Sequence, residues 1–111
     1  MDWAHEAAWL LGGAFLTNAI PHFVCGVMGR PFQTPFANPR GQGLSSSTLN
    51  VLWGSFNLAL AWLLLCRIGN FDLHSIECAS AAGLGMLLAG LGLARRFGRF
   101  NGGNAAGRPK P

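Results

Sequence analysis

His22 stands out among the residues that could carry chemistry, because it lies within a long apolar stretch. It belongs to the segment "TNAIPHF", residues 17–23, whose flanks consist mainly of Ala, Leu, Phe and Val. A histidine in such surroundings relays a proton, binds a ligand or holds a metal ion, or it is a neutral side chain satisfied by hydrogen bonds. The residues favour the hydrogen-bonded histidine and leave the functional roles as alternatives.

A metal site would need more ligands than this segment supplies. Cys25 follows His22 by three residues, so the two share one face of a helix. A tetrahedral site takes further His or Cys ligands at the same depth. The remaining ones fall toward the other end of the predicted helices: His5, Cys66, His74 and Cys78. The sequence therefore predicts no metal site.

Other catalytic arrangements are equally hard to find. The sequence offers no recognisable pairing of a nucleophile with a base, no pair of carboxylates and no Gly-rich phosphate loop. We therefore expect neither an enzyme nor a bound cofactor.

Three long apolar segments must position these polar residues. They run from about 7 to 28, 48 to 66 and 76 to 94, and each approaches the ~20 residues that cross a bilayer as a helix. Half of all residues are hydrophobic and 11% are charged, whereas soluble proteins have roughly a quarter charged. The sequence predicts an all-α membrane protein with three transmembrane helices, which together form one transmembrane domain over residues 1–94.

The basic residues predict how these helices are oriented. Short loops rich in Lys and Arg stay cytoplasmic. Arg67 lies between the second and third segments, and the other basic residues lie on the opposite side: Arg30, Arg40, Arg95, Arg96, Arg99, Arg108 and Lys110. We expect the N-terminus outside and the C-terminus inside, with residues 95–111 as a disordered basic cytoplasmic tail. The net charge of +4 is then an orientation signal and no nucleic-acid footprint.

Polar residues of the first two segments fall at matching depths. Counted from the middle of each segment at ~1.5 Å per residue, Asn18 lies level with Asn57. His22 lies level with Trp53, about a turn from Asn50. An amide that faces lipid leaves donors and acceptors unpaired, whereas two facing amides form hydrogen bonds. The sequence predicts a polar intramembrane seam made of Thr17, Asn18, Pro21, His22, Asn50, Trp53 and Asn57.

Pro21 is expected to kink the first helix within this seam. A proline removes the hydrogen bond to the carbonyl four residues earlier, which is that of Thr17. The Thr17 hydroxyl, the His22 ring or a buried water is expected to satisfy that carbonyl.

Cys66 and Cys78 lie at the two ends of a short connection. The shortness of the connection predicts that the second and third helices form an antiparallel hairpin. In an oxidising compartment the two cysteines form a disulfide if their Cα atoms lie within about 7 Å. The alternative, which the sequence favours, is two buried cysteines that pack as small hydrophobic residues.

Small residues line two faces of the third segment. One face carries Ala81, Gly85, Ala89 and Gly92, and the other carries Ala79, Gly83, Gly90 and Ala94. Small residues at this spacing let helix backbones approach closely. One face can pack within the chain and the other against a second subunit, so we expect an oligomer.

The connection between the first two segments is predicted to be a surface loop, because it contains Pro31, Pro35 and Pro39. Phe32 and Phe36 are expected to hold it against the membrane interface. A partner-binding loop is the alternative.

Four short sequence elements follow one another between residues 17 and 57: "TN..PHF", "GRPFQTPF", "GLSS" and "NVLWG..N". The block that contains them, residues 17–57, covers a little over a third of the chain. With these elements the chain resembles a family of uncharacterised small bacterial multi-pass membrane proteins. The resemblance implies the bacterial inner membrane and supplies no substrate, cofactor or catalytic residue.

Two functional hypotheses follow from these patterns. The first is a small integral membrane protein that works by packing, either as a homo-oligomer or as an accessory subunit of a larger membrane complex. The alternative is a small-molecule or ion transporter or channel, assembled from several copies, with a polar path around His22. The expected partners are membrane lipids and membrane proteins, and no nucleic acid.

Overall fold

Helices make up most of the computed structural model, which describes residues 2–105 and 107. α1 spans Trp3–Val27, α2 spans Ser47–Trp62 and continues as the π-helix η1 over Leu63–Ile68, and α3 spans Ile76–Asn101. Two short strands, β1 (Phe32–Gln33) and β2 (Leu44–Ser45), lie between α1 and α2. Three helical stretches, Trp3–Val27, Ser47–Ile68 and Ile76–Asn101, are long and apolar enough to cross a membrane, as the sequence predicts.

Side-chain caps begin the helices. Asp2 accepts a hydrogen bond from the backbone N–H of Ala4 at 3.0 Å at the start of α1. Ser46 and Ser75 cap α2 and α3 in the same way, through their hydroxyl oxygens. These bonds satisfy N–H groups that the first helical turn leaves without a partner.

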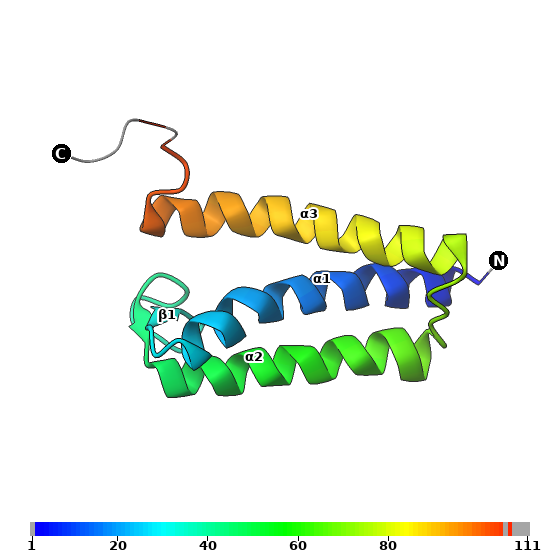
Figure 1. Cartoon of the computed structure of the whole chain (residues 1–111), viewed down its shortest axis with the longest axis horizontal. Helices are drawn as coiled ribbons and strands as arrows, with labels where there is room; N and C mark the ends of the chain where they lie inside the picture. The colour runs from blue at the N-terminus through cyan, green and yellow to red at the C-terminus, as the bar shows by residue number, and fades with distance from the viewer. Residues whose placement is uncertain (1, 106, 108–111) are drawn as a thin grey trace.

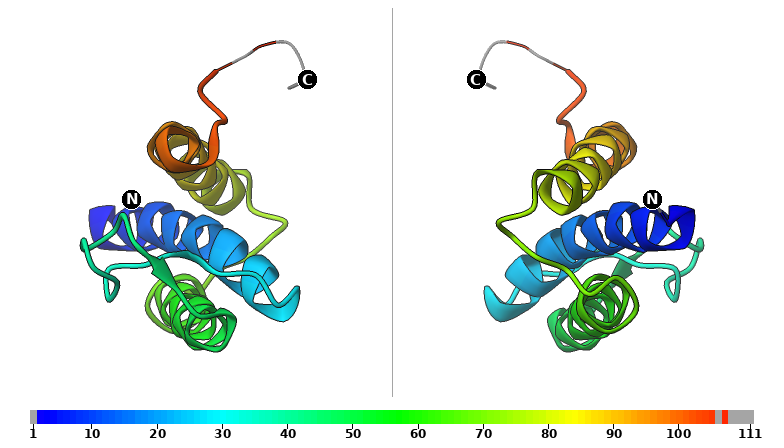
Figure 2. Two further views of the ribbon diagram at one scale, coloured as in Figure 1. Left: turned by 90° about the vertical axis from the view of Figure 1, so that its left-hand side faces the viewer. Right: turned by 90° about the vertical axis from the view of Figure 1, so that its right-hand side faces the viewer.

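α1 lies between α2 and α3, so the helices form a layer in the order α3–α1–α2 (Figure 1, Figure 2). α1 packs along both neighbours, whereas α2 and α3 make hardly any contact with each other. The prediction that α2 and α3 pack together as a hairpin is therefore wrong. The two helices do run in opposite directions, as an antiparallel hairpin requires. The short connection between them passes across the end of α1.

Glycines on two sides of α1 explain this order. A Cβ atom on Gly13 would overlap the carbonyl oxygen of Ala82 in α3, and one on Gly85 would overlap that of Leu10 in α1. A Cβ atom on Gly26 would meet the backbone of α2. Glycine is the residue that lets helix backbones approach so closely. α1 therefore has two closely packed sides.

α3 is longer than predicted. It continues past residue 94 to Asn101 and ends at Gly102, whose φ of 83° lies in the left-handed region that favours glycine. Residues 95–101 of the predicted disordered tail are thus helical. The side chain of Asn101 donates to Oε1 of Gln33 at 3.1 Å, which ties this end of α3 to the α1–α2 connection. Arg108 and Lys110 of the predicted tail lie outside the described residues.

The α1–α2 connection, residues 28–46, folds over one end of the helices, and we call it the cap (Figure 1). β1 and β2 pair antiparallel in it, with Phe32 opposite Ser45. The hydroxyls of Thr34 and Ser45 hydrogen-bond to each other, and both residues are buried together with Gln33. The predicted surface loop is therefore wrong for these residues, because their polar groups pair inside the cap.

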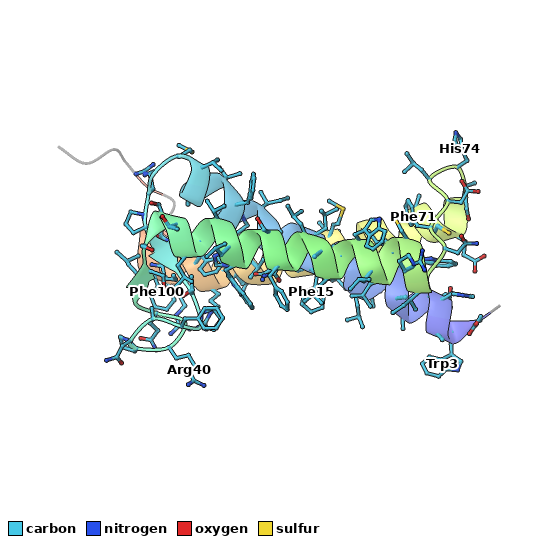
Figure 3. The ribbon with its side chains drawn as sticks, turned by 90° about the horizontal axis from the view of Figure 1, so that it is seen from below. Trp3, Phe15, Arg40, Phe71, His74 and Phe100 are labelled. Carbon is cyan, nitrogen blue, oxygen red and sulfur yellow. The ribbon has the colours of Figure 1, made fainter. Side chains whose placement is uncertain are left out.

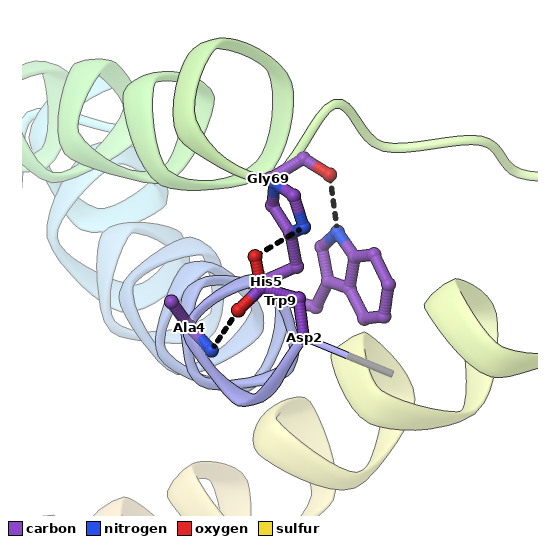
Figure 4. Close-up of polar contacts among 5 residues, drawn as sticks. All are labelled: Asp2, Ala4, His5, Trp9 and Gly69. Atoms are coloured by element: carbon purple, nitrogen blue, oxygen red, sulfur yellow. Dashed lines mark hydrogen bonds and ion pairs between the residues drawn. The ribbon is translucent and has the colours of Figure 1, made fainter.

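A second set of polar contacts closes the opposite end, where α1 begins (Figure 4). Nε1 of Trp9 donates to the carbonyl oxygen of Gly69 at 2.7 Å, which holds the end of η1 against α1. The His5 ring stacks on Trp9, with 6.1 Å between ring centroids, and its Nδ1 lies 3.2 Å from the Asp2 carboxylate. The two ends of the layer are thus fixed by different chemistry.

Candidate functional site

Asn18 and Asn57 meet in the middle of α1 and α2. Nδ2 of Asn18 donates to Oδ1 of Asn57 at 3.0 Å, as the matched depths predict. Nδ2 of Asn57 donates to the carbonyl oxygen of Trp53 at 2.8 Å, and Asn57 has no exposed surface. The two amides therefore satisfy each other within the chain.

Asn50 connects α1, α2 and the cap. Its Nδ2 lies within hydrogen-bonding distance of three carbonyl oxygens: Phe32 at 3.2 Å, Ser45 at 3.1 Å and Ser46 at 3.0 Å. Its Oδ1 lies 2.8 Å from Nδ1 of His22. The side chain is completely buried. One amide thus holds the cap strands in place over the start of α2.

The contacts of Asn50 also determine which ring nitrogen of His22 carries a hydrogen. Three carbonyl acceptors fix Nδ2 of Asn50 on the cap side, so its Oδ1 faces the ring and Nδ1 of His22 must carry a hydrogen. Nε2 of His22 has no hydrogen-bond partner among the described residues. Among the described residues, every fully buried side-chain nitrogen or oxygen has a hydrogen-bond partner. Nε2 therefore remains in contact with accessible space.

Aromatic rings surround the rest of His22. The rings of Phe32, Trp53 and Phe97 meet it edge to face, with centroids 5.5, 6.3 and 5.9 Å away. His22 is 2% exposed. Phe32, which was expected at the membrane interface, is thus part of this cluster, whereas Phe36 is exposed as predicted and packs on Trp53.

His22 borders a cavity of about 400 Å³ between the cap, α1, α2 and α3, which we call the His22 cavity. Its lining residues are Asn18, His22, Gln33, Thr34, Pro35, Arg40, Gly41, Trp53, Leu93, Arg96 and Phe97. A guanidinium nitrogen of Arg96 donates to the carbonyl oxygen of Gly41 at 3.1 Å across its rim. The cavity therefore combines one histidine, two arginines and neutral polar groups.

A groove of about 470 Å³ adjoins this cavity between α1 and α3, and we call it the α1–α3 groove. Its lining residues are Leu11, Ala14, Phe15, Asn18, Ala89, Gly92, Leu93 and Arg96. Asn18, Leu93 and Arg96 border both spaces. The groove is apolar along most of its length and becomes polar where it reaches the cavity.

Thr17 and Pro21 play a smaller part in the seam than predicted. The Thr17 hydroxyl donates to the carbonyl oxygen of Gly13 at 3.0 Å, and Nδ1 of His22 bonds Asn50. Neither of these bonds satisfies the Thr17 carbonyl. α1 nevertheless continues as a helix through Pro21.

The three cysteines are free and differ in their surroundings. Cys78 is buried in α3, Cys66 is exposed on η1, and Cys25 is half-buried in α1. Of the two reduced, buried cysteines that the sequence favours, only Cys78 is buried. In residues 2–105 and 107, no three His, Cys, Asp or Glu side chains come together in a way that could hold a metal ion.

Charges separate along the layer. Figure 3 shows Trp3 and His74 at one end, and Arg40 and Phe100 at the other. Two contacts between a histidine and a carboxylate lie at the first end, between Asp2 and His5 and between Asp72 and His74. Among the described residues, no carboxylate pairs with the arginines at the cap end.

Several residues of the His22 cavity were not predicted from the sequence. Gln33 and Thr34 were assigned to a surface loop, and Arg40 and Arg96 were counted only as orientation signals. Phe97 lay in the predicted disordered tail. Hydrophobic periodicity cannot identify such residues, because their position depends on how the cap folds.

Comparisons with protein-family models, curated proteins and solved structures find no match for this chain.

Proposed function

We propose that this chain is a multi-pass protein of the bacterial inner membrane that works by helix packing. It acts as one subunit of a homo-oligomer or as an accessory subunit of a larger membrane complex. Its N-terminus lies outside and its C-terminus inside. In this role it has no catalytic activity and needs no cofactor, and its partners are membrane lipids and membrane proteins.

The outward side of α3 carries this proposal. α3 packs on α1 at Ala82 and Gly85. On its other side, a Cβ atom on Gly83 would meet nothing within 4 Å. Exposed leucines surround this position: Leu84, Leu87 and Leu91. An open glycine among large apolar residues leaves a notch that a second helix fills by close contact.

The limited burial of α3 supports the same proposal. Only 17% of its most apolar stretch is buried within the chain, compared with 28% for α1. Helix association in a bilayer depends on close packing, because lipid already solvates apolar side chains. α3 is thus the helix with the most surface available for another subunit.

The alternative is a small-molecule or ion transporter assembled from several copies. The His22 cavity favours it, because this cavity brings a polar space to an otherwise buried histidine. The hydrogen bond between Asn18 and Asn57 opposes it, because the two amides satisfy each other and Asn57 has no exposed surface. A path through the membrane would need walls from further copies.

The copy number in native lipid tests the proposal. The wild-type chain, extracted in lipid nanodiscs and measured by native mass spectrometry, is expected to contain two or more copies or a co-purifying membrane protein. Gly83→Leu is expected to separate them, whereas Gly92→Leu, a matched change in the α1–α3 groove, is expected to leave them together. A wild-type monomer without partners would contradict the proposal, and solute uptake into vesicles would favour the transporter.

A further inference from the structure

We propose that the His22 cavity and the α1–α3 groove together bind one anionic phospholipid. The phosphate lies between Arg40 and Arg96 at the rim of the cavity, and one acyl chain lies in the groove. This inference goes beyond the packing role, because it assigns a ligand to a space within one chain.

The first argument is unbalanced charge at the rim of the cavity. Arg40 and Arg96 both line it, and no described carboxylate pairs with either of them. The described acidic residues lie near the opposite end of the helices, at the starts of α1 and α3 or in the connection before α3: Asp2, Glu6, Asp72 and Glu77. Two guanidinium groups without a counter-charge attract an anion, and a phosphate accepts several of their hydrogen bonds at once.

Donors remain available for such an anion. Arg96 uses one guanidinium nitrogen for the carbonyl oxygen of Gly41, which fixes the side chain across the rim and leaves its other N–H groups free. His22 lines the same space, and its Nε2 has no hydrogen-bond partner among the described residues. The side chains of Gln33 and Thr34 add neutral polar groups to the lining. The cavity therefore suits a polar headgroup.

The second argument is the continuity of this polar space with an apolar one. The groove shares Asn18, Leu93 and Arg96 with the cavity. From Asn18, in the middle of α1, it follows the helix away from the cap to Leu11, a distance of about 10 Å at ~1.5 Å per residue. An amphiphile with its charge at the cap end and its chain in the groove matches both spaces. A soluble anion would leave the groove unused.

The place of the site along the helices agrees with a lipid. The cap end carries most of the basic residues of the chain, where a positively charged pocket between transmembrane helices meets lipid headgroups. The groove opens to the surface of the layer at Gly92, where a Cβ atom would meet nothing within 4 Å. A lipid can therefore enter from the side, within the bilayer.

Lipid binding by the full-length chain tests this proposal. The chain in a neutral detergent is titrated with phosphatidylglycerol or with phosphatidylcholine of the same acyl chains, and bound lipid is counted by native mass spectrometry. Phosphatidylglycerol is expected to bind at least tenfold more tightly. Arg40→Gln with Arg96→Gln is expected to weaken it by roughly 25-fold, since each arginine near a lipid surface contributes about fivefold.

Two matched controls separate the site from general effects. Arg30→Gln with Arg95→Gln removes the same charge from the same end but changes no residue of either space, so phosphatidylglycerol binding is expected to persist. Gly92→Leu fills the groove and is expected to weaken both lipids, whereas Gly83→Leu is expected to weaken neither. Thermal unfolding of each variant confirms that it is folded.

Three results would overturn the proposal. Equal binding of the two lipids would remove the role of the arginines. An equal loss of phosphatidylglycerol binding in Arg30→Gln with Arg95→Gln would show that binding depends on overall charge and not on Arg40 and Arg96. Inorganic phosphate or glycerophosphoglycerol that binds as tightly as the intact lipid would make the ligand a soluble anion, and the groove would have no part in binding.

Discussion

His22 and Asn50 join α1 to α2 through one hydrogen bond of 2.8 Å between Nδ1 and Oδ1. The same asparagine reaches three backbone carbonyl oxygens of the cap and the start of α2 through Nδ2. The cap therefore depends on a side chain that also fixes the histidine. Changes at either residue are expected to affect both.

Asn50→Ala is expected to lower the free energy of unfolding by about 2 to 3 kcal/mol, because it leaves buried donors and acceptors without partners. Unfolding in mixed detergent, followed by circular dichroism, measures this loss. Leu52→Ala on the exposed side of α2 is the control and is expected to cost less than about 1 kcal/mol. Equal losses in the two variants would show that the Asn50 contacts contribute little.

His22→Asn is expected to keep most of the stability, because the amide of Asn supplies an N–H donor for Asn50. His22→Leu is expected to cost about 1 to 3 kcal/mol, because Oδ1 of Asn50 is then buried without a partner. Thermal unfolding of the two variants distinguishes them. If both variants unfold like the wild type, His22 has no structural role. A functional role of its free Nε2 would then better explain why a histidine lies at this position.

The Asn18–Asn57 pair is expected to show coupling in a double-mutant cycle. Asn18→Leu or Asn57→Leu alone leaves one amide unpaired, whereas the double variant leaves neither of the two unpaired and recovers part of the loss. The coupling energy is expected to be about 0.6 to 2 kcal/mol, the range for hydrogen bonds between membrane helices. Strictly additive losses would mean that the pair does not act as a unit.

Gly85→Ala is expected to weaken the contact between α1 and α3, because its Cβ atom would overlap the carbonyl oxygen of Leu10. The matched change Gly92→Ala, measured in detergent without added lipid, adds the same methyl group where nothing lies within 4 Å, and the higher helix propensity of alanine makes it neutral or slightly stabilising. The difference in melting temperature between the two variants measures the packing. No difference would contradict the close approach.

The orientation is expected to be N-out and C-in, because among the described residues five arginines lie on the cap side and Arg67 alone lies on the other. The five are Arg30, Arg40, Arg95, Arg96 and Arg99. A reporter that is active only in the cytoplasm, fused after Pro111, is expected to be active. A cysteine at Gln42, in a variant without native cysteines, is expected to resist impermeant thiol reagents applied from outside. Labelling at this position would reverse the orientation.

Hydrophobic length was enough to predict three helices, and depth matching was enough to pair Asn18 with Asn57. Both depend on regular helix geometry, which the sequence encodes directly. The contacts of Asn50 and the burial of Thr34 depend instead on a strand pair of four residues within the cap. So short a ladder has no periodicity to detect.

The order of the helices was the larger error. A short connection between α2 and α3 suggested that these two helices pack together, because neighbours in sequence usually pack. The decisive signal lay in α1, where Gly13 and Gly26 allow close approach on two different sides. The small residues of α3 indicate close packing, but Gly13 on the α3 side of α1 is what selects α1 as the partner of α3.

The central position of α1 has a consequence for biosynthesis. α1 is made first, yet it remains without one of its two neighbours until α3, the last helix of the chain, leaves the ribosome. α2 and α3 have little contact with each other. The connection between Gly69 and Ser75 therefore acts as a tether and contributes little to the interface of α3. A chain divided between Asp72 and Leu73 retains both helix contacts of α1, so the two fragments are expected to reassemble when they are produced together.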